Sequence, residues 1–357
     1  MGLKATLATV ASLGRIPSAS LLSAALLAGC NTNYPNPLLG TINTGQPGAQ
    51  DDIVFTSDSW GTSPSGLGEV FSLSSTVAGV PRQLTFCNQT QACNTFEASS
   101  APDRMRLAMR RVLTDTNGDG VLTPDDGEAM IFVDLSRGVE APLVPQTGRV
   151  SGLDWSPSDG TIVYSGLGAS NAEDLFTIGT NGQNVTNATN TPSIRERRPR
   201  YDPTASNVVF ERIDPAVGKG AVWYFNASGV ELQVDPGSSG TAALAGTPYV
   251  VGADADPVFS PDGTQVAFRR LTSASGSGGT WDIVTCKIDG TSVTPIVTGP
   301  LYRSAPDWGP RGIVFAEGSS SAPSSLVLVQ GDGSGRRVLL SLTGGYTLNL
   351  PRWLPGS

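Results

Sequence analysis

The sequence predicts an all-β protein, and three observations support this. Glycine and proline, with 43 and 26 copies among 357 residues, together approach a fifth of the chain, which suits many short strands joined by turns. Charged residues are only 15% of the chain, and long helices are not expected. A strand-turn-strand pattern recurs at a steady interval, so one large β domain can account for most of the length.

The clearest copy of the repeat covers residues 256–268, where a strand ends in Phe259, a Pro-Asp-Gly turn follows and a β-branched strand comes next. Weaker copies of the same pattern follow or precede it, and the strand-ending aromatics are Trp155, Tyr201, Phe259, Trp308 and Trp353. They are separated by 46, 58, 49 and 45 residues, an interval typical of β-propeller blades. We expect each aromatic to pack as a wedge between two blades.

The repeat predicts a six-bladed β-propeller of four-stranded blades. A third strand follows the copies, as in residues 174–178 and 221–225, and a turn and a fourth strand come after it. The chain ends on the first half of a copy, at 350–356, while the domain opens on a second half, Asp51 to Phe55. The two ends should therefore complete one blade together and leave no open sheet edge. A seventh blade between Tyr201 and Phe259 is the alternative, although residues 237–245 look like a loop.

These aromatic-Ser-Pro-Asp-Gly turns resemble the repeat of the TolB-type propeller, a relative of the WD-repeat class, over about residues 51–357. The resemblance implies a cell-envelope interaction domain. The α/β domain that precedes the propeller in that family has no counterpart here, so the family's partnership with a peptidoglycan-associated lipoprotein does not simply carry over.

The first thirty residues predict an export signal. Lys4 and Arg15 precede an apolar run at 21–28 that is too short to span a bilayer. The run ends in Leu27-Ala28-Gly29-Cys30, which resembles the bacterial lipobox, so residues 1–29 would be removed and Cys30 acylated. Residues 30–50 then form a flexible tether, and Asn31 favours the outer membrane if the bacterium is Gram-negative. The alternatives are an ordinary secretory signal or a buried N-terminal helix.

Charge and cysteine content narrow the function classes. The net charge is −8, and it becomes −10 once Lys4 and Arg15 are removed, so nucleic acid is a poor candidate partner. The sequence has no histidine, which excludes hydrolases that rely on one. Cys87 and Cys93 flank a short polar loop and are expected to form a disulfide in an oxidising compartment, rather than a two-ligand metal site. Cys286 is expected to be buried.

Residues 115–126 resemble the EF-hand calcium loop. Asp115, Asn117, Asp119, Val121 and Asp126 occupy the liganding positions 1, 3, 5, 7 and 12, and Gly120 stands at the sharp turn. Position 12 is Asp rather than Glu, which shortens its reach. The flanking segments look like strands, so a structural calcium staple on a hairpin loop is expected instead of a helix-loop-helix sensor. A solvated acidic turn is the alternative.

Two weaker signals concern the propeller axis. Arg195, Arg197, Arg198 and Arg200 lead into the fourth blade's first strand, where they could form an anion-binding channel mouth or a solvated rim. Asp154, Asp256 and Asp307 stand beside the wedge aromatics, and their recurrence favours an architectural role over an acid/base pair.

The function that these observations favour is non-catalytic. A lipid-anchored propeller outside the cytoplasm would bind a protein or an envelope polymer through its channel face and loops. The alternative is a propeller-based enzyme that acts on glycans through carboxylates or a metal.

Overall fold

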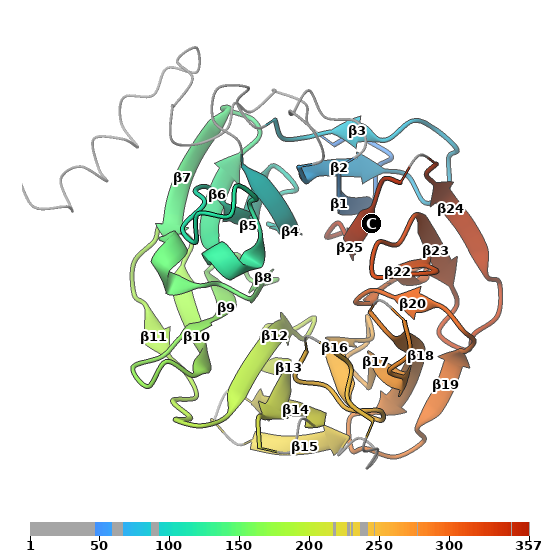
Figure 1. The fold of residues 1–357 in the computed structure, drawn as a ribbon. Helices are drawn as coiled ribbons and strands as arrows, with labels where there is room; N and C mark the ends of the chain where they lie inside the picture. The colour runs from blue at the N-terminus through green and yellow to red at the C-terminus, as the bar shows by residue number, and fades with distance from the viewer. Residues whose placement is uncertain are drawn as a thin grey trace, which may run out of the picture. The chain divides into compact units, whose positions relative to one another are not determined.

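The structure of the protein is a computed structural model. It describes residues 47–58, 67–86, 93–216, 219–226, 229, 231–235, 242–245, 247–276, 278–343 and 345–356. These residues form six antiparallel sheets around one axis, with two short 3-10 turns, η1 (Pro124–Asp126) and η2 (Gln146–Gly148) (Figure 1). The predicted all-β, six-bladed propeller of four-stranded blades is thus confirmed.

The blades are numbered from the one that contains the first strand, and each is given from its inner to its outer strand. Blade 1 is β25 (Leu348–Trp353), β1 (Ile53–Ser57), β2 (Glu69–Leu73) and β3 (Arg82–Gln83). Blade 2 is β4 (Asn94–Ser100), β5 (Arg106–Val112), β6 (Ala129–Asp134) and β7 (Val139–Val144). Blade 3 is β8 (Gly152–Trp155), β9 (Thr161–Leu167), β10 (Glu173–Gly179) and β11 (Thr186–Asn187).

The remaining blades follow the same order. Blade 4 is β12 (Arg195–Tyr201), β13 (Asn207–Asp214), β14 (Lys219–Asn226) and β15 (Glu231–Asp235). Blade 5 is β16 (Asp254–Phe259), β17 (Gln265–Ser273), β18 (Thr280–Lys287) and β19 (Thr294–Val297). Blade 6 is β20 (Tyr302–Arg303) with β21 (Asp307–Gly309), then β22 (Gly312–Gly318), β23 (Ser325–Val329) and β24 (Arg337–Ser341).

The inner strand of blade 6 is the one departure from four continuous strands. β20 and β21 both pair with β22, and Pro306 lies in the break between them. Pro199, Pro257 and Pro351 stand at the corresponding place in inner strands that remain continuous, so the proline by itself does not account for the break.

Separate apolar clusters between neighbouring blades form the core. In one of them, Val209 and Val222 of blade 4 pack with Phe259 and Val266 of blade 5. In another, Trp353 of blade 1 packs against the cluster that holds Val314 of blade 6. The strand-ending aromatics therefore lie between blades, as the repeat predicts, and each blade buries its faces against its neighbours.

The chain closes the ring with its last strand. Ile53 of β1 pairs with Trp353 of β25, and Ser57 pairs with Leu348. The predicted completion of one blade by both ends of the domain is confirmed. In the interval that could have held a seventh blade, the described residues show an isolated bridge between Ala243 and Val250 and no further sheet.

The propeller has two faces, which we name by the inner strands. The start face is where β4, β8, β12, β16, β20 and β25 begin, and the turn face is where their far ends lead into turns such as residues 156–160. β1 pairs antiparallel to β25, and the N–H of Leu354 donates to the carbonyl of Asp52, so the chain enters the propeller on the turn face. In the described part of the chain no helix is long and apolar enough to cross a membrane.

Candidate binding site at the propeller axis

A short motif recurs in the inner strands and aims polar side chains at the axis. In four blades a proline stands two residues before the wedge aromatic, at Pro199, Pro257, Pro306 and Pro351. The residue before the proline has a positive φ in three of them: 55° at Arg198, 53° at Asp256 and 44° at Leu350.

At these points the strand ladder shifts register, which is the mark of a β-bulge. A bulge re-aims the side chain of the extra residue, and a left-handed backbone at a non-glycine residue is costly unless the surrounding structure holds it. Here Arg198, Asp256 and Leu350 all line one small cavity on the axis. Gly152 allows the arrangement, because a Cβ at that position would lie 2.9 Å from the Arg198 backbone.

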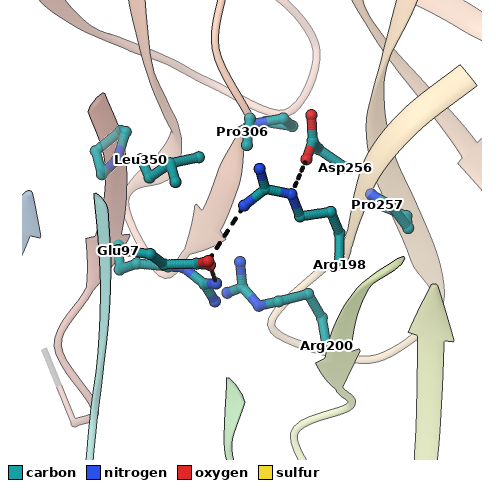
Figure 2. A pocket seen from close by; sticks show the side chains of 10 residues that line it. Glu97, Arg198, Arg200, Asp256, Pro257, Pro306 and Leu350 are labelled. Atoms are coloured by element: carbon teal, nitrogen blue, oxygen red, sulfur yellow. Dashed lines mark hydrogen bonds and ion pairs between the residues drawn. The ribbon is translucent and has the colours of Figure 1, made fainter. Parts of the chain in front are cut away.

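Ion pairs close the narrow middle of the channel, which we call the waist. Arg198 lies between two carboxylates, 3.2 Å from Glu97 and 3.3 Å from Asp256 (Figure 2). Glu97 also contacts Arg352. The cavity left among these groups is about 10 Å³, roughly the space of one water molecule. The waist is therefore filled by the protein's own side chains, and a ligand must bind at one of the two openings.

A second layer of ion pairs lies next to the waist, toward the turn face. Arg200 contacts Asp307 and lies 3.4 Å from Asp154, while Arg352 lies 3.1 Å from Asp154. Both carboxylates also hold the backbone of the next blade. Asp154 accepts the N–H of Tyr201 at 2.9 Å, and Asp307 accepts the N–H of Trp353 at 2.6 Å. These aspartates act as links between blades, which agrees with the architectural role inferred from their recurrence.

Three guanidinium groups keep Glu97 ionised. Burial by itself raises the pKa of Glu97, but Arg352, Arg110 and Arg198 outweigh it and lower the pKa to about 2. Glu97 is 1% exposed and Arg110 is 4% exposed, so this charge cluster is a fixed part of the interior.

The start face carries two adjoining cavities, which together we call the start-face trough. One, of about 270 Å³, lies at the channel mouth, and the other, of about 400 Å³, extends outward over blades 2 to 4. Both are lined by Pro124, Glu128 and Arg197. Across the two cavities the charged side chains are six arginines and four acids: Arg110, Arg149, Arg195, Arg197, Arg198 and Arg269, with Asp125, Glu128, Glu173 and Asp256.

The excess positive charge lies in the outer part of the trough. Arg195 and Arg197 share one carboxylate, Glu173, at 4.0 Å and 3.1 Å. Arg149 is exposed and donates to the backbone carbonyl of Asp125 at 3.0 Å, and among the described residues it has no carboxylate within 4.0 Å. Three guanidinium groups are thus served by one carboxylate, in a protein whose net charge is −8.

The turn face carries a different cavity, a funnel of about 420 Å³. Every blade contributes a proline from the turn after its inner strand: Pro102, Pro157, Pro203, Pro261, Pro310 and Pro355. The wedge aromatics form the wall, and the indole N–H groups of Trp155 and Trp353 are bonded within the protein, to Asp159 and Gly312. The floor holds Arg200 and Arg352 with their partners Asp154 and Asp307, so its charges are balanced.

The EF-hand-like loop forms part of the trough wall. It connects β5 and β6, the second and third strands of blade 2, as predicted, and Pro124 and Asp125 line the cavities. Asp115 accepts the backbone N–H groups of Gly118 at 2.6 Å and Gly120 at 2.7 Å. The φ of Gly120 is 83°, as the sharp turn at position 6 requires.

At position 12 of the loop, Asp126 is committed to the backbone. Its carboxylate accepts N–H groups from Thr116 at 2.8 Å, Asn117 at 3.1 Å and Thr123 at 3.0 Å. Asp119 likewise bonds the N–H of Val121 at 2.8 Å. Within the described ranges no group of three acidic, cysteine or histidine side chains is placed to hold a metal ion. Calcium binding therefore stays a prediction from the loop sequence.

The predicted cysteine sites are covered only in part. Cys30 and Cys87 lie outside the described residues. Cys93 is 2% exposed and disulfide-bonded, and its pairing with Cys87 stays a prediction. Cys286 is a buried free thiol, and burial raises its pKa to about 12, which makes it unreactive near neutral pH.

The four arginines noted in the sequence lie in different places. Arg200 belongs to the buried ion pairs of the channel, Arg198 belongs to them and also lines the trough, and Arg195 and Arg197 line the trough. Sequence reasoning missed Glu97, Arg110, Arg149, Arg269 and Arg352. The recurring proline before each aromatic is a signal that could have located the waist, because the residue before that proline lines it in four blades.

Comparisons with known proteins show the fold. No family model matches the chain, and no curated protein sequence matches it. Among solved structures, TolB from Acinetobacter baumannii is similar with a TM-score of 0.60 and 16% identity, over 87% of this chain and 68% of that one. A chain of a nidogen/laminin complex is similar with a TM-score of 0.60 and 11% identity, over 85% of this chain and 98% of that one.

An enzyme shares the same architecture. A puromycin-hydrolyzing peptidase of Mycobacterium tuberculosis is similar with a TM-score of 0.54 and 10% identity, over 88% of this chain and 55% of that one. Likeness at such identities describes the fold alone. The residues around the axis are therefore the guide to function.

Proposed function

Starting from a TolB-like six-bladed β-propeller, we propose that this chain is a lipid-anchored, extracytoplasmic interaction module. It binds a protein or a cell-envelope polymer in the start-face trough and does not catalyse a reaction. The anchor is Cys30, and the compartment is the cell envelope, at the outer membrane if the bacterium is Gram-negative.

One observation carries the proposal: the waist is closed while the trough is open. The charged residues of the waist and of the layer beside it form ion pairs with one another and leave a cavity of only about 10 Å³, so the channel is neither a conduit nor a deep pocket. The trough, by contrast, offers a long polar surface with exposed arginines. Such a surface suits an extended segment of a larger partner better than a small substrate.

The carboxylates of the trough support binding over catalysis. Glu128 pairs with Arg110 at 2.7 Å, Asp256 with Arg198 at 3.3 Å and Glu173 with Arg197 at 3.1 Å. A general acid or a nucleophile needs a carboxyl group that reaches the substrate, and these three carboxylates are each held by a guanidinium, whereas Asp125 is exposed.

The chain enters the propeller on the face opposite the trough. Residues 47–52 lead into β1 on the turn face, whereas the trough lies on the start face.

Site-specific photo-crosslinking in intact cells tests the proposal. A photoreactive residue at Asp125, in the trough, should give one dominant crosslinked product. The same residue at Leu232, which is 48% exposed on an outer strand, serves as the control. Equal crosslinking patterns from the two positions, or none from Asp125, would contradict the proposed site.

An enzyme acting on glycans is the second candidate, and one observation favours it. Burial raises the pKa of Glu128, while Arg269 and Arg198 overcome the effect of burial and lower the pKa of Asp256, and both residues line the same cavity. Carboxyl groups whose pKa values are driven apart are typical of acid/base pairs. Release of reducing ends from acidic polysaccharides, lost in Glu128→Gln, would establish this activity in place of the binding function.

A further inference from the structure

We infer that the partner segment in the start-face trough is an acidic peptide, held by Arg149, Arg195 and Arg197. This inference rests on the proposed binding function and names the ligand class for the same site.

The local charge of the outer cavity favours an acidic ligand. In the outer cavity these three guanidinium groups face Asp125, Glu128 and Glu173, but Glu128 is already engaged by Arg110 at 2.7 Å. The Asp125 contact to Arg149 is made by its backbone carbonyl, which is neutral. With Glu128 set aside, Glu173 and the exposed side chain of Asp125 remain against the three arginines, so about one positive charge is left for a ligand.

Arg149 and Arg195 are accessible to a ligand from solvent. Arg149 is exposed, and Arg195 keeps 48% of its side-chain surface in solvent. Arg197 is 25% exposed, and its Nε lies 3.1 Å from the Glu173 carboxylate. Arg149 and Arg195 can therefore donate to a ligand without first breaking a close internal pair, and Arg197 adds positive charge beside them.

The guanidinium group is well suited to bind a carboxylate. Its planar fork matches a carboxylate with two parallel N–H···O bonds, and its weak hydration lowers the cost of forming such a pair. Arg149 comes from the loop after blade 2, whereas Arg195 and Arg197 belong to β12 of blade 4. Carboxylates spread along an extended chain would meet both sides of the cavity.

The lining of the outer cavity favours a peptide over an acidic glycan. The outer cavity is lined by Pro124, Ser151, Leu167 and Asn171 in addition to the charged residues, and none of its lining residues is aromatic. Sugar rings are commonly held by stacking on aromatic side chains, whereas Asp and Glu side chains need only the guanidinium donors.

The test uses fluorescent octapeptides of glutamate and of glutamine, with an octamer of galacturonate as an acidic glycan. The purified propeller-containing chain should bind the glutamate peptide at low salt at least tenfold more tightly than the glutamine peptide. Binding should weaken as salt screens the charges. The triple variant Arg149→Gln, Arg195→Gln, Arg197→Gln should lose at least tenfold in affinity.

A matched variant controls for net charge. Arg82→Gln, Arg137→Gln, Arg337→Gln removes three exposed arginines outside the trough and should bind like the wild type. Thermal melting of both triple variants verifies that they are folded. Equal losses in the two variants, or no binding of the glutamate peptide to the wild type, would overturn the inference. Tighter binding of galacturonate, lost in the trough variant, would reject the peptide and assign a glycan instead.

This experiment separates the two proposals. If crosslinking from Asp125 persists while the trough variant still binds its partner normally, then the binding site stands and the acidic-peptide ligand is wrong. If crosslinking fails as well, the binding function itself is wrong.

Discussion

Arg352, in the last strand of the chain, forms a buried ion pair with Glu97 of the second blade. Arg352 is 6% exposed and Glu97 is 1% exposed, and the two are separated by 255 residues in the sequence. The strand that closes the ring thus also places a charge at the centre of the channel. Ring closure and the sealed waist are linked through Glu97. The carboxylate that pairs with Arg352 of the closing strand also pairs with Arg110 and Arg198.

The first prediction concerns Glu97→Gln. Loss of the carboxylate leaves three guanidinium groups without their shared counter-charge, and breaking a buried pair of this kind costs about 3–5 kcal/mol. Urea unfolding at pH 7 should show that loss. Glu231→Gln, which removes a half-buried partner of Arg212 on an outer strand, is the control and should cost less. If the Glu97→Gln variant is as stable as the wild type, the ion pairs of the waist do not contribute to the free energy of unfolding.

The second prediction is the pH dependence of the same group. The pKa of Glu97 is about 2 in the folded protein against 4.5 when unperturbed. Since a lowered folded-state pKa gives stability above the unfolded value, that stability is complete above about pH 4.5 and is lost as the pH falls toward 2. The difference corresponds to on the order of 3 kcal/mol. Acid titration of the unfolding free energy should show a smaller decline in Glu97→Gln than in the wild type, and parallel curves would contradict the assignment.

The third prediction is that deletion of residues 346–357 prevents stable folding. It removes β25, exposes the edge of β1 and takes away Trp353. Loss of the fully buried Leu348 and Leu354 costs about 2–5 kcal/mol each, and the partly buried Trp353 adds to that, against a usual folding free energy of roughly 5–15 kcal/mol. The truncated chain should aggregate or be degraded in a solubility assay. Tyr346→Ala in the full-length chain, at a residue 44% exposed, should melt like the wild type. A soluble truncated domain with an unchanged melting temperature would show that closure is dispensable.

The fourth prediction concerns the lipid anchor. Cys30→Ala should leave an uncleaved, unlipidated precursor, because the thiol of Cys30 is the proposed acyl acceptor. Metabolic labelling with a palmitate analogue measures the modification, and membrane fractionation measures its consequence. Cys286→Ser, at a buried free thiol, is the control and should be labelled like the wild type. Equal labelling of the Cys30 variant would exclude the anchor.

The fifth prediction concerns calcium at the EF-hand-like loop. If the loop binds calcium, the melting temperature should rise with calcium according to RT ln(1 + [L]/Kd) and fall on addition of a chelator. Asp115→Ala with Asp119→Ala should abolish this difference. Asp289→Ala with Asp332→Ala removes two exposed turn aspartates elsewhere and should preserve it. If the melting temperature of the wild type changes with neither calcium nor chelator, the loop is a solvated acidic turn and not a calcium site.

Much of the fold could be predicted because its signals are local. The wedge aromatics recur at blade spacing, and the turns after them carry Pro, Asp and Gly at positions that suit tight reversals. Even the long-range pairing of β1 with β25 could be predicted, since each end of the domain carries one part of the same repeat. The candidate site was harder, because only Arg195, Arg197, Arg198 and Arg200 form a visible cluster in the sequence.

The strands, the number of blades and the closure follow from the sequence, because alternation, turn chemistry and repeat spacing are properties of neighbouring residues. Which charged side chains form ion pairs depends instead on the folded ring. Glu97 finds Arg352 because the ring closes, and Arg198 turns toward Asp256 because a bulge before Pro199 changes the direction of its side chain. Arg149 is left without a carboxylate partner in the described structure by the same geometry, since Asp125 presents its backbone carbonyl to it. Ion pairing depends on distances of a few ångströms between distant segments, and no local pattern encodes those distances.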